Sequence, residues 1–385
     1  MKKEILKELI AKPGKEHHVS DFNPSFTTDM SKQDAKEQLG KDIERLSELQ
    51  SMLYAQDCYS ILVIFQAMDA AGKDGTIKHV MSGINPQGCQ VYSFKQPSAE
   101  ELDHDYLWRI NRSLPERGRI GIFNRSHYED VLIAKVHPEI VLSNKLPNIT
   151  KTEDIDSDFW QHRYRQINNF ERYLTENGTV IIKFFLNVSK EEQKKRFLER
   201  LNDESKNWKF SSADIKERQY WNHYMKAYSD VLTETSTEIA PWYVIPADNK
   251  WFMRYAVGRI ICTRMEALDL HYPQLSKEEL EKLEYIQASV LNSNDFSDKF
   301  IIDAHGKWKN RDFEADEYGY LSIYRFQLIS TSKKSIPKKL SYIGNFLNLT
   351  PPDKEFIMEI KENIRPIDWK KVEEDVLTKY FLYNK

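Results

Sequence analysis

Short continuous apolar runs alternate along the chain with longer segments whose apolar residues recur every three or four positions. The clearest apolar run is residues 60–65, Ser-Ile-Leu-Val-Ile-Phe, which is rich in β-branched side chains. A run of this kind is typical of a strand that is buried on both faces, as in a parallel sheet. Similar runs predict four more strands, at 90–94, 119–123, 180–186 and 242–245.

Helical periodicity fills the intervals between these runs. Before the first strand, Ser31 and Asp34 have the spacing of a capping box, and leucines and isoleucines then recur at helical spacing up to Leu53. Further helices are predicted from Thr76 and over 100–113, 126–134, 159–176, 189–203, 212–235 and 250–270, with an irregular insertion at 142–156. Strands and helices in alternation predict an α/β fold with a parallel sheet and right-handed crossovers.

The two ends of the chain have a different character. Residues 1–30 show no clear period and are interpreted as an N-terminal extension. After Pro273 an amphipathic stretch at 275–291 is followed by strand-like runs at 299–302 and 320–329. We therefore predict a main domain over 31–273 and an α+β extension over 274–385. A structural extension without chemistry is favoured over roles in oligomerisation or partner binding.

Composition limits the classes of function. The chain has 385 residues, 40% hydrophobic and 30% charged, which is ordinary for a globular protein. A formal net charge of −3 disfavours DNA or RNA as a partner, so an anionic substrate would need a local basic groove. No apolar run approaches the ~20 residues of a membrane span. The three cysteines are far apart and form no metal or disulfide pattern, so a reducing cytoplasm is expected.

The segment after the first strand carries the strongest chemical signal. It reads Ala67-Met68-Asp69-Ala70-Ala71-Gly72-Lys73-Asp74-Gly75-Thr76. A glycine turn and a lysine between a buried strand and a helix are typical of a P-loop, which surrounds a phosphate with backbone N–H groups. The match to G-x-x-x-x-G-K-[ST] is partial, because Ala67 replaces the first glycine and Asp74 replaces the Ser/Thr that binds magnesium. An ordinary turn with a solvated lysine is the alternative, although Asp69 could hold Mg²⁺ instead.

A second polar group follows the strand that ends at Phe123: Asn124-Arg125-Ser126-His127-Tyr128-Glu129-Asp130. In P-loop kinases a second carboxylate that orders the metal lies near the end of a neighbouring strand. Arg125 would reach the same crevice and clamp a phosphoryl group. The alternative is a helix-surface ion pair between Arg125 and Asp130, which contributes little.

Basic residues for a groove are available on the predicted helices of 190–235. Arg196 and Arg200 are four residues apart and share one helix face, and Lys209 follows beyond. Such a helical excursion resembles the lid of small nucleotide kinases, which excludes water. Neighbouring glutamates would equally suit a solvated, salt-bridged helix pair.

Several motifs together resemble the polyphosphate kinase 2 family, and within it the class III branch. They are residues 68–78 (MDAAGKDGTIK), 79–88, 123–132 (FNRSHYEDVL), 171–178, 195–200, 208–211 and 240–248 (APWYVIPAD). The resemblance is collinear over about 30–273. It implies a thymidylate-kinase-like P-loop fold with a helical lid at about 190–235. It also implies metal-dependent phosphoryl transfer between inorganic polyphosphate and AMP or ADP, with ATP as a product and guanine nucleotides as alternative acceptors.

The resemblance also implies roles for individual residues. Asp69 would hold metal or the acceptor phosphate, Lys73 would stabilise the moving phosphoryl group, and Arg125 would clamp phosphate. Asp130 completes the predicted catalytic set, and the metal candidates are Asp69, Glu129 and Asp130, for Mg²⁺ with Mn²⁺ as an alternative. The predicted phosphate- and nucleotide-binding residues are Ala71, Gly72, Asp74, Gly75, Thr76, Lys78, Asn124, Arg196, Arg200 and Lys209. Asn124 stands where other branches carry aspartate, so the second metal ligand stays open among Asn124, Glu129 and Asp130. A homo-oligomer is the expected assembly.

Two other functions stay open. An ATP-dependent nucleotide or small-molecule kinase could use the same loop. A non-catalytic protein that binds polyphosphate or nucleotide is a second alternative, although a pure binder has no need for carboxylates that hold metal.

Overall fold

The computed structural model describes residues 8–204, 212–277, 279, 280 and 283. The chain divides into two units, Met1–Pro273 and Gln274–Lys385, and nearly all described residues belong to the first. The predicted strands of the C-terminal extension therefore lie outside the described residues. Within the described residues, no helix is long and apolar enough to cross a membrane.

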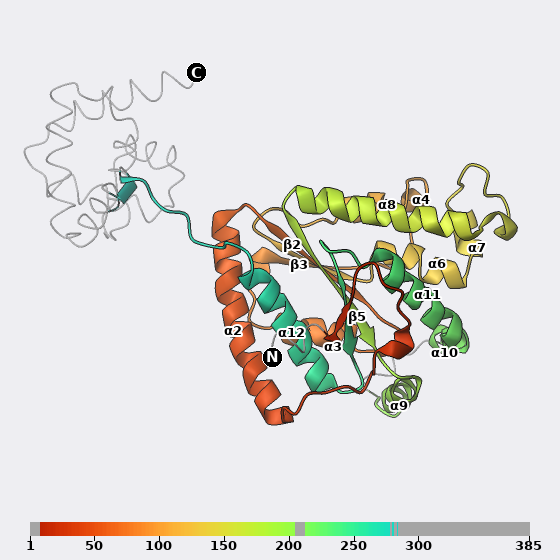
Figure 1. Ribbon diagram of the computed structural model, residues 1–385, viewed down its shortest axis with the longest axis horizontal. Helices are drawn as coiled ribbons and strands as arrows, with labels where there is room; N and C mark the ends of the chain where they lie inside the picture. Colours follow the sequence, from red (N-terminus) through yellow and green to blue (C-terminus); the bar gives the residue numbers. More distant parts are fainter. Residues whose placement is uncertain (1–7, 205–211, 278, 281–282, 284–385) are drawn as a thin grey trace, which may run out of the picture. The chain divides into compact units, whose positions relative to one another are not determined.

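Within the described residues, six strands form one sheet in the order β1-β6-β5-β2-β4-β3 (Figure 1). Their bounds are β1 Ile10–Ala11, β2 Ser60–Gln66, β3 Cys89–Ser93, β4 Ile120–Asn124, β5 Thr179–Asn187 and β6 Trp242–Pro246. All neighbours are parallel except β1, which runs antiparallel to β6 at the edge. The predicted parallel sheet and its five strands are confirmed.

The N-terminal segment contributes the unpredicted strand. Leu9 and Ala11 are buried against the sheet, and the Val19 amide donates to Ser229 Oγ at 3.0 Å. Residues 8–22 therefore pack against the rest of the first unit. A strand of two residues is too short to leave a periodic signal in the sequence.

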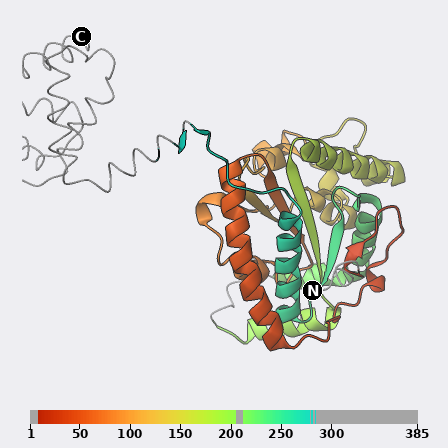
Figure 2. The ribbon, with the colours of Figure 1, turned by 60° about the vertical axis from the view of Figure 1, so that its left-hand side comes forward.

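Helices cover both faces of the sheet (Figures 1 and 2). On one face α12 lies along α2 and also contacts α3, and on the other face α8 packs on β5 and contacts α11. The helix bounds are α2 Lys32–Gln56, α3 Lys73–Val80, α4 Ala99–Leu102, α5 Trp108–Asn111, α6 Ile133–Val136, α7 Glu139–Leu142, α8 Ser157–Glu176, α9 Lys190–Leu201, α10 Ser212–Gln219, α11 Trp221–Thr235 and α12 Lys250–Glu266. Short 3₁₀ turns are η1 Val19–Asp21, η2 Pro86–Gly88, η3 His127–Asp130 and η4 Thr152–Asp154.

Four helix predictions need correction. The predicted helix over 212–235 is two helices, α10 and α11, separated by a turn at Tyr220. The predicted helix over 100–113 is two short helices, α4 and α5. The predicted helix over 126–134 is the 3₁₀ turn η3 followed by α6, because Arg125 has a φ of 65° and Ser126 is extended, so a regular helix cannot start there. The helix expected from Thr76 already begins at Lys73.

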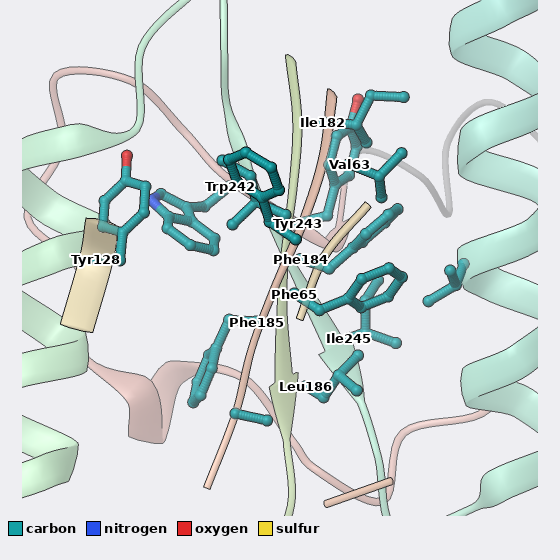
Figure 3. Packing of buried hydrophobic residues seen from close by; sticks show 14 of the residues in the cluster. Val63, Phe65, Tyr128, Ile182, Phe184, Phe185, Leu186, Trp242, Tyr243 and Ile245 are labelled. Carbon is teal, nitrogen blue, oxygen red and sulfur yellow. The ribbon is translucent and has the colours of Figure 1, made fainter. Parts of the chain in front are cut away.

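Successive side chains of each strand point to opposite faces of the sheet and so contribute to the core on both sides. Phe184 and Phe185 are consecutive on β5 and point to opposite faces of the sheet (Figure 3). Phe184 stacks on Phe65 at a ring distance of 5.2 Å, and on the other face Tyr128 packs edge-on against Trp242 at 4.7 Å. The sheet is therefore covered by aromatic side chains on both faces.

A buried ion pair lies inside this core. Lys183 Nζ is 2.6 Å from Glu171 Oε2, and it also donates to the Tyr128 hydroxyl at 2.9 Å and the Thr235 carbonyl at 2.7 Å. Tyr128 in turn donates to Glu171 Oε1 at 2.7 Å. Because Tyr128 belongs to η3, this network anchors the turn that carries Glu129 and Asp130.

Candidate functional site

The site lies where the adjacent strands β2 and β4 end. Phe65 and Asn124 are paired in the sheet, and the Arg125 amide donates to the Phe65 carbonyl at 3.0 Å. The loop after each strand therefore leaves the same edge of the sheet at the same level. This carboxyl edge is where open α/β sheets bind ligands.

The loop after β2 has the backbone of an anion site. Ala70 and Gly72 both have positive φ, 60° and 110°. The first hydrogen bond of the helix runs from the Thr76 amide to the Gly72 carbonyl, so the amides of Lys73, Asp74 and Gly75 precede it. Amides at a helix N-terminus attract phosphate. The P-loop interpretation of this segment thus has the required backbone.

Two features favour glycine at position 72. Its φ of 110° is one that side chains rarely adopt, and a Cβ there would lie 3.1 Å from Met253 Cε on α12. The glycine therefore allows the loop to approach α12 closely.

Lys73 folds back over the loop. Its ammonium donates to the Ala67 carbonyl at 2.8 Å. Burial lowers its pKa, and the nearby carboxylates of Asp69, Glu129 and Asp74 oppose that shift. A lysine held among carboxylates at the mouth of an anion site can follow a transferring phosphoryl group.

Arg125 joins the two loops through an ion pair with Asp69, at 3.1 Å between Nη2 and Oδ1. The alternative pairing with Asp130 is therefore not the contact found. The positive φ of Arg125 is uncommon for a non-glycine residue, and its side chain reaches Asp69 in the neighbouring loop. Backbone strain of this kind clusters at functional sites.

A second contact between the two loops is a hydrogen bond from the side-chain amide of Asn124 to the carboxylate of Asp74. Asn124 Nδ2 donates to Asp74 Oδ1 at 2.8 Å. Asp74 stands in the first turn of α3, where a carboxylate is favoured by the helix dipole. An aspartate at 124 would face this carboxylate directly, so the amide suits its partner.

Glu129 and Asp130 are neighbours in η3 but face different surroundings. Burial raises the pKa of Glu129, while Arg125 and Lys73 lower it and Asp69 raises it further. Burial raises the pKa of Asp130 to about 6, against the lowering effect of Arg163 and Arg109. The opposing charges on Glu129 thus come from Arg125 and from Lys73 of the phosphate loop (residues 67–76), whereas those on Asp130 come from a separate pair of arginines.

These two arginines belong to the arginine–aromatic cluster, which comprises Phe94, Tyr106, Arg109, Phe159 and Arg163. The Arg163 guanidinium lies 4.0 Å from the Tyr106 ring centroid and 5.3 Å from that of Phe159, and Arg109 lies 5.5 Å from that of Phe94. None of these residues was predicted from the sequence. The available signal was Arg163 itself, a basic residue on the apolar face of α8 between Trp160 and Ile167.

The metal candidates are only partly brought together. Among the described residues, no group of three His, Cys, Asp or Glu side chains is arranged to hold a metal. The carboxylates of Asp69 and Glu129 both act on Lys73, and oxygen donors of this type suit Mg²⁺. The charges that lower the pKa of Asp130 are instead those of Arg163 and Arg109. The carboxylates of Asp69 and Glu129 are therefore donors of a type compatible with a hard divalent ion beside the phosphate loop.

The remaining residues predicted to bind phosphate differ in whether their side chains are exposed or bonded to other protein groups. The Thr76 hydroxyl is buried and donates to the Gly72 carbonyl at 3.0 Å, so it braces the loop. Lys78 is exposed in the last turn of α3. Arg200 pairs with Asp214 of α10 at 3.6 Å, and Lys209 lies outside the described residues. Arg196 is buried and hydrogen-bonds to backbone carbonyls.

Comparison with known proteins agrees with this geometry. The family Polyphosphate kinase 2 (PPK2) matches residues 29–273. A protein of Rhodopseudomonas palustris named ADP-polyphosphate phosphotransferase is 55% identical over 261 residues, which cover 68% of this chain and 89% of that protein. A Meiothermus ruber protein named AMP/ADP-polyphosphate phosphotransferase is 44% identical over 271 residues, 70% of this chain and 96% of its own length.

A solved structure shares the fold. The crystal structure of polyphosphate kinase 2 from Arthrobacter aurescens TC1 matches with a TM-score of 0.64 at 40% sequence identity. The match covers 72% of this chain and 98% of that one. The predicted P-loop kinase-like fold is confirmed.

Proposed function

This chain belongs to the polyphosphate kinase 2 family, and we propose that it transfers the terminal phosphoryl group of inorganic polyphosphate to AMP and ADP. Relatives named for AMP and ADP support these acceptors. A Pseudomonas aeruginosa relative named GDP-polyphosphate phosphotransferase, 34% identical over 213 residues, keeps guanine nucleotides as alternative acceptors.

The observation that carries the proposal is the convergence of Lys73, Arg125 and Asp69 at the N-terminus of α3. Phosphoryl transfer needs positioning and charge neutralisation rather than a protein nucleophile. The amides at 73–75 would receive the phosphoryl oxygens, Lys73 would follow the group as it moves, and Arg125 would clamp it from the neighbouring loop. The two loops together thus supply positive charge from two sides.

A divalent cation completes the charge balance. We propose Mg²⁺, with Mn²⁺ as the alternative, held by Asp69 and Glu129. Such an ion neutralises charge on the phosphates and orients them. The Asp69–Arg125 ion pair would hold the Asp69 carboxylate in place on the crevice side of the loop.

The arginine–aromatic cluster suits the nucleotide acceptor. Aromatic rings stack on bases, and guanidinium groups both stack on aromatic faces and pair with phosphates. Asp130, on which the charges of Arg163 and Arg109 act, directly follows Glu129 in η3, so an acceptor bound at the cluster would lie near the phosphate loop. We propose that the acceptor enters from this side.

Further expectations accompany this function. The helices of 190–235 would form a lid over the crevice, and 274–385 would be a structural extension of the domain at 31–273. A cytoplasmic homo-oligomer is expected.

Product analysis tests the function. The protein is incubated with Mg²⁺ and polyphosphate, without ATP, and AMP and ADP are offered separately. We expect ADP and ATP as products. An absence of any higher nucleotide, combined with phosphorylation when ATP replaces polyphosphate, would instead establish the ATP-dependent kinase.

A further inference from the structure

Arg196 on α9 is enclosed by the protein rather than directed toward the crevice. The resemblance implies a lid arginine that meets phosphate. In the structure, only 5% of its side-chain surface is exposed. Its guanidinium donates to Glu192 Oε1 at 2.9 Å, and otherwise to backbone carbonyls of two different loops.

The two loops are the phosphate loop and the segment that follows β6. Nη1 donates to the carbonyls of Ala70, at 3.2 Å, and Ala71, at 2.6 Å. Nη2 donates to those of Ala247, at 2.6 Å, and Asp248, at 3.1 Å. With Nε on Glu192, each of the five N–H groups of an arginine has an acceptor.

Gln193 extends the same arrangement by one residue. It is almost completely buried, and its Nε2 donates to the Asp69 carbonyl at 3.0 Å. Arg218 of α10 donates to Gln193 Oε1 at 2.6 Å and so fixes the orientation of the amide. Three successive carbonyls of the phosphate loop, at 69, 70 and 71, therefore accept hydrogen bonds from α9.

We propose that Gln193 and Arg196 are positioning residues that fix the conformation of the phosphate loop, and that Arg196 is not a ligand of phosphate. Carbonyl oxygens repel an anion, whereas amides attract it. Donors on α9 hold these carbonyls on the side of the loop away from the anion site. The role of these residues in turnover rests on the proposed function.

The arrangement explains why an arginine is needed. A planar guanidinium can donate hydrogen bonds to two pairs of carbonyls in fixed directions, whereas a lysine ammonium is a point charge with three donors. Arg196→Lys keeps the charge but cannot bridge both loops. Lysine can still serve as a phosphate ligand, so this variant separates the two roles.

The first experiment measures hydrogen exchange of the amides in residues 67–75 in the full chain without substrates. We expect faster exchange in Arg196→Lys and in Gln193→Leu, which removes one loop contact without a change of charge. Arg259→Lys is the matched control, because Arg259 binds the buried Asp42 at 2.9 Å on the α2 side of α12. It should leave exchange of the loop unchanged.

The second experiment uses steady-state kinetics with polyphosphate as donor. We expect both variants to lower kcat, by about 10- to 100-fold for Arg196→Lys, because small misplacement of reacting groups is costly. The KM for the nucleotide should change little. The dependence of the polyphosphate KM on ionic strength should keep its wild-type slope, since no phosphate contact is lost.

Wild-type loop exchange in Arg196→Lys, together with a shallower salt slope, would overturn the proposal and make Arg196 a phosphate ligand. Wild-type kcat and loop exchange in Gln193→Leu would also contradict it. If the wild-type protein transferred nothing from polyphosphate, the proposed function would fail, whereas the exchange experiment would still decide the role of α9.

Discussion

The Arg125 guanidinium lies 3.1 Å from the Asp69 carboxylate and joins the loops that follow two adjacent strands. The pair is partly exposed, so it contributes little to stability, about 0–1 kcal/mol. The ion pair instead holds the Arg125 and Asp69 side chains in place near Lys73. We therefore expect substitutions here to affect turnover far more than folding.

Lys73→Ala and Asp69→Ala test this separation. We expect each to lower kcat/KM by ~100-fold or more, because removal of one preorganised electrostatic group costs about 10²–10³ in rate. Tm should change little. Lys41→Ala serves as control, because it breaks an exposed ion pair with Glu37 on α2, remote from the strand ends. Retained turnover in either site variant would place the active centre elsewhere.

The hydrogen bond between Asn124 and Asp74 predicts that activity depends on the charges at these two positions. Asn124→Asp sets a second carboxylate beside Asp74, where the amide now donates at 2.8 Å. We expect a drop of about 5- to 10-fold in kcat/KM, since like charges near a surface repel by about 1 kcal/mol or more. The double variant with Asp74→Asn restores a donor and an acceptor and should recover most of the loss. Additive losses in the double variant would contradict a direct interaction.

Asp130 predicts a pH-dependent stability in metal-free protein. Burial raises the pKa of Asp130 from 3.8 to about 6. Between about pH 4 and about pH 6 the folded protein therefore keeps a proton on this carboxyl that the unfolded chain has released. Stability must then fall as pH rises from about 4 to about 6, by at most about 3 kcal/mol for a shift of about two units. Asp130→Asn removes this cost.

Urea unfolding with a chelator present, at pH 8 and at pH 4, measures the effect. We expect Asp130→Asn to be more stable than wild type at pH 8, with the gain disappearing by pH 4. Asp103→Asn is the control, because a hydrogen bond from Lys145 lowers the pKa of this exposed carboxyl. Its effect on stability should therefore change with pH in the opposite direction. An equal gain at both pH values would assign the effect to packing instead of titration.

The buried Lys183–Glu171 pair predicts strong non-additivity. Lys183→Met leaves an uncompensated carboxylate in the core and should cost about 3–5 kcal/mol. Adding Glu171→Leu removes that charge and should recover much of the loss. Urea midpoints of the single and double variants measure this coupling. Because Tyr128 binds the same pair, the single variant should also lower kcat through η3.

The sequence by itself determined the sheet and the position of the phosphate loop. Continuous apolar strands and intervening periodic helices depend on local side-chain character, which is readable without contacts. Gly72 and Lys73 mark the loop for the same reason, since the conformational freedom of glycine and the charge of lysine are properties of single residues. The motifs around Asp69 and Arg125 likewise pointed to the correct family.

Only the tertiary structure decided the partners of these groups. Glu129 and Asp130 are adjacent in sequence, but they lie in a 3₁₀ turn whose Tyr128 is buried, and different charges act on them. Arg125 and Lys73 act on Glu129, whereas Arg163 and Arg109 act on Asp130. Arg196 was predicted to line a basic groove, yet it is buried and binds carbonyls of two segments distant in sequence. Such partners depend on where crossovers bring separate loops together, and spacing along the chain does not encode that.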